Sequence, residues 1–147
     1  MNSHVFNIVF TGLAALIWSG SGFAHEESSP LGVGVTATDV HTISCFDDGN
    51  GTPAFLLFEL VAGAPANGPV VSAQILVPDK QIVMNVTDPV SGDLGGSGEV
   101  RIDGGTSPYR VIVNKAGAGK AFYTMIYHCE TAGSIHTGTD QSYSQNQ

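Results

Sequence analysis

The sequence predicts an all-β fold, an antiparallel β-sandwich of the jelly-roll or immunoglobulin-like kind with seven to eight short strands. Three observations lead to this prediction. Short apolar segments recur between turn signals, several of them alternate apolar and polar side chains, and no stretch has the periodicity of a full helix. Because no helical segment is available to connect parallel strands, the strands are expected to pair antiparallel.

The expected strands follow one another at even spacing after a polar lead at residues 26–30. The first is residues 40–46, and an additional strand is expected near residues 33–37. The others, in chain order, are residues 54–61, 70–77, 81–86, 98–102, 109–114 and 121–129. Loops rich in Gly, Pro, Asn and Asp separate them, and these are the residues that tight turns require. In the last strand one face is expected to point to the core, the face of Tyr123, Met125, Tyr127 and Cys129.

The chain divides into a leader, one domain and a tail. Residues 1–24 have the features of a secretory signal, an apolar run too short to span a bilayer followed by small residues up to Ala24. The start of this leader has no Lys or Arg, so an uncleaved anchor is the alternative. Residues 25–136 are predicted to form the β-sandwich domain, and the polar residues 137–147 a tail that is frayed or pairs along an edge. Cleavage would leave a secreted or periplasmic protein with no transmembrane anchor.

The charge of the chain excludes one class of partner. Thirteen acidic residues against five Lys and Arg give a net charge of -8, and no basic stripe is present. A polyanion would therefore be repelled, so nucleic acid is excluded as a partner. Few charges and many small polar residues are typical of secreted proteins, for which a protein or a cell-surface component is the expected partner.

The two cysteines are expected to form one long-range disulfide. Cys45 and Cys129 each lie in an apolar, strand-like segment. In an oxidising compartment they can close a loop that spans most of the domain. The alternative is a pair of buried free thiols, and no CxxC motif supports a redox role.

The rhythm of strands and turns around residues 55–60, 71–76, 109–114 and 122–127 resembles that of bacterial pre-peptidase C-terminal domains. This resemblance covers about 80 residues and is a pattern of strands, not a signature motif. It implies a non-catalytic secreted module with a jelly-roll-like sandwich. Such modules are usually attached to a hydrolase and sometimes carry calcium in acidic loops. The long-range cysteine pair departs from the family pattern.

A copper site is the sharpest functional hypothesis from the sequence. Processing after Ala24 would place a free amine and an imidazole on one residue, His25, and this pair can chelate a metal. One or two further imidazoles, from His41, His128 or His136, would complete a T-shaped or square-planar site of the kind suited to Cu(II). His41 and His128 lie close in sequence to the two cysteines, so a disulfide would bring their strands together. The alternative is that these are ordinary surface or strand-end histidines.

Calcium is the second hypothesis for a metal. Asp47, Asp48 and Asn50 lie in a Gly-rich turn, and Ca²⁺ prefers several such oxygens in one loop. The segment does not follow the EF-hand pattern, and hairpins use Asp-Gly and Asn-Gly for ordinary turns. The alternative is therefore a turn without a metal.

No catalytic motif is present. Ser44 has no G-x-S-x-G setting, and no H-E-x-x-H occurs. We therefore expect a secreted, non-catalytic binding or association module, which could be a subunit of an extracellular assembly or a homo-oligomer joined through strand edges. The alternative is a periplasmic or extracellular copper-binding protein that uses His25.

Overall fold

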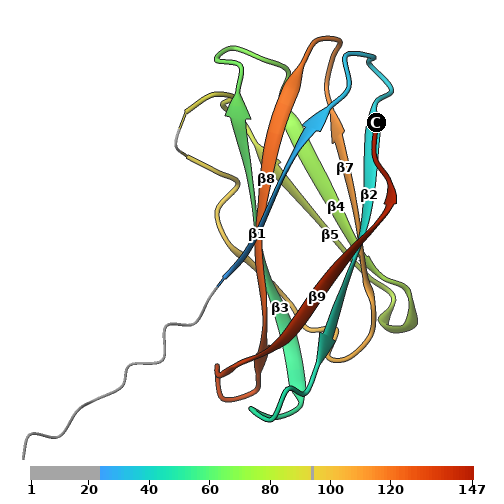
Figure 1. Ribbon diagram of the computed structural model, residues 1–147, viewed down its shortest axis with the longest axis vertical. Helices are drawn as coiled ribbons and strands as arrows, with labels where there is room; N and C mark the ends of the chain where they lie inside the picture. Colours follow the sequence, from blue (N-terminus) through green and yellow to red (C-terminus); the bar gives the residue numbers. More distant parts are fainter. Residues whose placement is uncertain (1–23, 94) are drawn as a thin grey trace, which may run out of the picture.

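The computed structural model describes residues 24–93 and 95–147, and these form an antiparallel all-β fold, as predicted (Figure 1). Apart from Ala24, the predicted leader lies outside the described residues. One 3₁₀ turn, η1 (Pro78–Lys80), joins the fourth and fifth strands. The strands are β1 (His25–Leu31), β2 (Thr38–Phe46), β3 (Pro53–Ala64), β4 (Val71–Val77), β5 (Ile82–Asp88), β6 (Val100–Ile102), β7 (Tyr109–Lys115), β8 (Ala121–Thr131) and β9 (His136–Gln145).

The strands belong to one sheet that curls into a nearly closed barrel. Their order is β5-β4-β7-β2-β9-β8-β3-β6, and β1 is added on β8. The sheet is continuous because β9 changes partner along its length: His136 and Thr137 pair with β8, and residues 138–145 pair with β2. A sandwich of two separate sheets is therefore not confirmed, since β9 joins the two halves (Figure 1).

Hydrogen bonds on the outer edge of β3 connect the two ends of the sheet, β5 at one end and the β3–β6 pair at the other. The backbone N–H of Ala62 donates to the carboxylate of Asp88 over 2.7 Å, and Asp88 is the last residue of β5. The segment after β5 continues this contact: Gly92 N–H donates to the Ala62 carbonyl, and Ser97 N–H to the Leu60 carbonyl. Much of this edge is thus occupied by the chain itself.

The core lies inside the barrel and is built by alternation along the strands. On β8 the predicted face is buried, with Tyr123, Met125, Tyr127 and Cys129 pointing inward. On β7 the buried residues are Tyr109, Val111, Val113 and Lys115, which alternate with more exposed positions. Buried and more exposed side chains therefore alternate along these strands, as the alternating sequence pattern predicted.

The seven strands expected from residue 40 to residue 129 are all present, but the two ends of the domain differ from the prediction. Residues 33–37 form a turn, not a strand, and the Ala37 N–H donates to the Gly34 carbonyl there. The polar lead instead forms β1, which pairs with β8 along its whole length. The polar tail is neither frayed nor an edge: it forms β9, between β2 and β8. Polar segments become strands here because neighbouring strands supply their hydrogen-bond partners.

Candidate functional site

Two histidines and a glutamate lie together where β8 ends and β9 begins. The rings of His128 and His136 stack, with centroids 4.4 Å apart and planes inclined by 26°. His128 Nε2 lies 3.3 Å from a carboxylate oxygen of Glu130. The sheet register explains the grouping, since His136 pairs directly with Glu130 and alternation puts His128 on the same face of β8 as Glu130.

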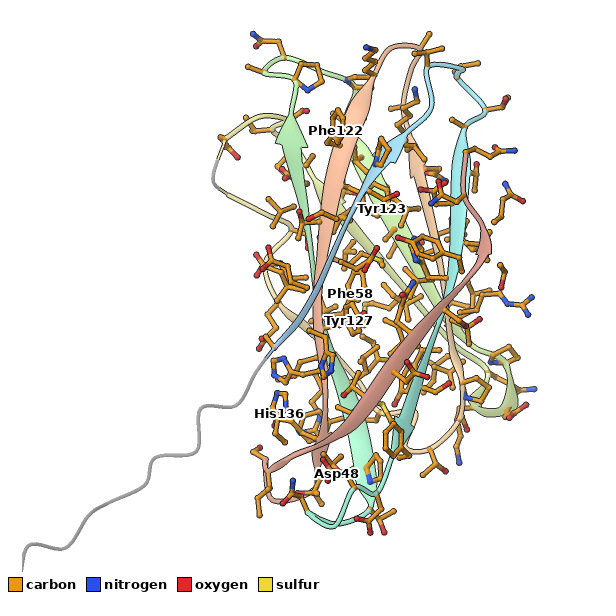
Figure 2. The ribbon with its side chains drawn as sticks, viewed as in Figure 1. Asp48, Phe58, Phe122, Tyr123, Tyr127 and His136 are labelled. Atoms are coloured by element: carbon orange, nitrogen blue, oxygen red, sulfur yellow. A yellow bond between two sulfur atoms is a disulfide. The ribbon has the colours of Figure 1, made fainter. Side chains whose placement is uncertain are left out.

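His25 reaches the same end of the sheet from β1. It is opposite Tyr127, and its ring stacks on the Tyr127 ring with centroids 5.9 Å apart, so it shares the face of Tyr127 and lies on the other face of β8 from His128. Along this edge of β8 the start of β1 follows directly after the start of β9, which pairs with Cys129 and Glu130. Figure 2 shows imidazole rings gathered around the labelled His136, near Tyr127.

The electrostatics of this histidine cluster, defined as His25, His128 and His136, favour neutral imidazole at His136. Burial is the main cause that lowers the pKa of His136, and the charges of His128 and His25 lower it further. The carboxylates of Glu130 and Asp48 act in the opposite direction but do not reverse the shift. A neutral imidazole is the form that coordinates a metal.

His41 is not part of this cluster. It is fully buried, and both of its ring nitrogens have partners: Nε2 is 2.7 Å from the Tyr123 hydroxyl, and Nδ1 is 2.7 Å from the side-chain amide of Gln141. The Tyr123 hydroxyl in turn donates to the buried carboxylate of Asp39 over 2.7 Å. Since this hydroxyl proton goes to Asp39, His41 donates through Nε2 and accepts through Nδ1. No lone pair of the ring is left for a metal.

The loop proposed for calcium is built as a hydrogen-bonded turn. One carboxylate oxygen of Asp47 accepts from the backbone N–H groups of Gly49 and Gly51, at 2.8 and 3.0 Å. An oxygen of Asp48 accepts from the N–H of Asn50 and lies 3.3 Å from the hydroxyl oxygen of Thr137. Both glycines have positive φ, which explains the Asp-Gly and Asn-Gly sequence there. These contacts account for the loop without a cation.

The cysteines form the predicted bond between Cys45 and Cys129, with 5.7 Å between their Cα atoms. The bond links β2 to β8 across the start of β9, because Cys45 pairs with Thr139 and Cys129 pairs with Thr137. The histidine cluster lies next to this bond, since Cys129 separates His128 from Glu130 in the sequence. A disulfide is typical of an oxidising extracellular or periplasmic environment.

Sequence reasoning missed Glu130 and Tyr127 as contacts of the histidine cluster. Glu130 had a usable signal, because a residue two positions after His128 on a strand lies on the same face. The stacking of His25 on Tyr127 had none, since it depends on pairing between segments about a hundred residues apart.

Comparisons add no assignment to these observations. No protein family model, curated protein or solved structure matches the chain. Within residues 24–93 and 95–147, no three His, Cys, Asp or Glu side chains converge in an arrangement that could hold a metal ion. Nor does this part of the chain contain a helix with the length and hydropathy needed to cross a bilayer.

Proposed function

We propose that this chain is exported, loses residues 1–24 and works outside the cytosol as a non-catalytic binding module whose ligand is Cu(II). The observation that carries the proposal is the histidine cluster: His128 and His136 stack, and His25 lies at the same end of β8, where its charge contributes to lowering the pKa of His136. Among them is His25, the first residue of the mature chain in this proposal. The disulfide supports export, because such bonds persist in oxidising compartments.

The chemistry of the cluster favours copper over other divalent ions. Cleavage would give His25 a free amine next to its own imidazole, so one residue supplies two nitrogen ligands. A third nitrogen is near at His136, whose lowered pKa keeps the ring neutral at pH 7. Nitrogen ligands of this kind bind Cu(II) more tightly than the other first-row divalent ions. Since His25 itself supplies two ligands, the site needs fewer side chains than a site made of separate residues.

Titration of the purified mature protein with Cu(II) tests this proposal. The protein should begin at His25, and the matched control carries one additional residue before His25, which turns the amine of His25 into a peptide nitrogen but leaves the imidazole. We expect the control to bind Cu(II) at least tenfold more weakly, and His136→Ala to weaken binding in the native-terminus protein. Equal affinity of the native and extended proteins would contradict the amine chelate. A parallel titration with Zn²⁺ measures the preference for copper.

Association with a protein or cell-surface component, or with a second copy of the chain, is the second candidate function. Apolar side chains are exposed together at the opposite end of β1: Val33 and Val35 lie in the turn after β1, and Phe122 lies opposite Pro30. A hydrogen bond from the Gly119 N–H to the Val33 carbonyl holds this turn beside the loop before β8. Clusters of exposed apolar side chains are typical of contact surfaces.

Size-exclusion chromatography with light scattering over a range of concentrations tests association between copies. We expect the wild type to form larger species, and Val33→Ser/Val35→Ser to lower their amount. Val83→Ser is the matched control, because Val83 is equally exposed but lies on β5. A wild type that stays monomeric at high concentration would contradict self-association.

A further inference from the structure

The alternation of buried side chains continues in phase from β1, through the turn, into β2. Every buried residue of β1 and of β2 has an odd number. In the turn between these strands the apolar residues Val33, Val35 and Ala37 have odd numbers as well. Residues 29–45 therefore carry the pattern of one continuous strand, although the chain reverses direction inside that segment (Figure 1).

The turn at residues 32–37 leaves this strand pattern unused. Val33 and Val35 are 61% and 59% exposed, whereas β-branched residues in a strand normally pack on a buried face. No residue of the turn has a positive φ, so none of them is held in a conformation far from an extended chain. Among these residues, all of which the structure describes, one backbone hydrogen bond forms, from the Ala37 N–H to the Gly34 carbonyl. Opening the turn therefore loses little within it.

β1 is the first strand of the fold, and its partners all lie beyond the turn. Its seven residues pair in register with β8, and the hydroxyl oxygens of Ser28 and Thr124 lie 2.8 Å apart across this pair. The hydroxyl of Tyr143 on β9 donates to the carboxylate of Glu27. A second copy of the chain offers the same groups in the same register. A β1 that moves to a second copy thus recovers the contacts that it leaves.

We propose that two copies of this chain exchange β1. The turn opens, β1 and β2 of each copy become one long strand, and each β1 pairs with β8 of the other copy. A two-fold axis at Gly34 sets Val33 of one copy opposite Val35 of the other, so the two exposed valines become cross-strand partners. This inference rests on the second candidate function, association between copies, and it names the segment that joins them.

Two cysteine variants test the exchange directly. Ser28→Cys and Thr124→Cys are made in separate proteins, unfolded together in urea at acidic pH with the native disulfide intact, refolded at high concentration and then oxidised. A bond between the two kinds of chain requires β1 of one copy to lie on β8 of the other. We expect such bonds, identified by mass spectrometry of the linked peptides, in at least tenfold greater amount than for a control pair.

Ser72→Cys and Thr87→Cys are the matched control pair. The hydroxyl oxygens of Ser72 and Thr87 also lie across a strand pair, 2.9 Å apart. Their strands, β4 and β5, are joined by the tight turn η1, which leaves no connection long enough to open. Bonds between the two control chains at the level of the test pair would show unspecific contact and overturn the inference.

Deletion of residues 33–36 separates exchange from contact through the exposed valines. It keeps the phase of the alternation and leaves two residues between β1 and β2. The end of the chain lies between these strands, because Gln147 accepts from the Gly32 N–H and donates to Asp39. Two residues cannot reverse the chain across two strand spacings, about 10 Å. Exchange therefore predicts at least tenfold more dimer in size-exclusion chromatography, whereas association through the valines predicts less.

The remaining outcomes separate failure of the exchange from failure of association. If the deletion variant does not fold, insertion of Gly-Ser-Gly-Ser after Gly34 provides the opposite test, since a longer turn favours the monomer, and an unchanged dimer fraction would overturn the inference. Larger species in the wild type without the bond between Ser28→Cys and Thr124→Cys chains would overturn the exchange and leave association standing. A wild type that remains monomeric after refolding at high concentration contradicts both.

Discussion

Loss of the Cys45–Cys129 bond is the perturbation whose effect on stability can be calculated most directly from the structure. The bond joins residues 84 positions apart, so it closes a loop that contains most of the domain. It also connects β2 and β8, the two strands on either side of β9. Breaking it removes a constraint from the unfolded chain and leaves the native strand pairing in place.

The expected magnitude follows from the entropy of closing that loop. For a separation of 84 residues, the chain-entropy model gives a loss of about 4.5 kcal/mol in the free energy of unfolding at 25 °C. Domains of this size usually have a total stability of about 5–15 kcal/mol. The reduced protein should therefore be marginally folded, with a melting temperature lower by roughly 15 °C.

Urea unfolding of the oxidised protein, the reduced protein and a Cys45→Ala/Cys129→Ala variant provides the measurement. The reduced protein keeps both sulfur atoms in the core, so its difference from the oxidised protein reports the constraint alone. The double variant should lose more, because both cysteines are buried and their sulfurs leave a cavity. A change of less than about 1 kcal/mol on reduction would refute the argument that the bond acts mainly on the unfolded chain.

Three further predictions concern the interior and β9. Burial lowers the pKa of His41 from 6.5, against the opposing charges of Asp39 and Glu27, so the native state holds this ring neutral while the unfolded chain protonates it. The stability that the neutral His41 ring contributes is complete above pH 6.5 and is lost as the pH falls toward the lower native pKa, by at most about 1.4 kcal/mol per pH unit. His41→Gln should therefore make the free energy of unfolding depend less on pH in urea titrations between pH 5 and 7. Tyr123→Phe removes the hydroxyl between His41 and Asp39 and should lower the free energy of unfolding, measured by chemical denaturation, by about 1–3 kcal/mol. An unchanged free energy of unfolding would show that this network contributes nothing. Deletion of residues 136–147 removes a strand from inside the sheet, so circular dichroism should show loss of cooperative unfolding, whereas a true tail could be removed without effect.

Local pattern was enough for the middle of the chain. The seven strands between residues 40 and 129 were predictable because each carries an alternation of apolar and polar residues and ends at a turn residue. The pairing of Cys45 with Cys129 was predictable for a similar reason, since two cysteines in strand-like segments leave one possible bond. Burial follows the side-chain period of a strand, and that period is written in the order of the residues.

The ends of the domain and the histidine cluster depended on pairing between distant segments. β1 and β9 have few apolar residues, and they are strands because β8 and β2 offer them unpaired backbone groups. The amino-acid order offered both His41 and His128 as copper ligands, yet β2 places the first in the core and β8 places the second beside His136 and Glu130. Which side chains meet is set by register and by the curl of the sheet, and neither is encoded in a single stretch of residues.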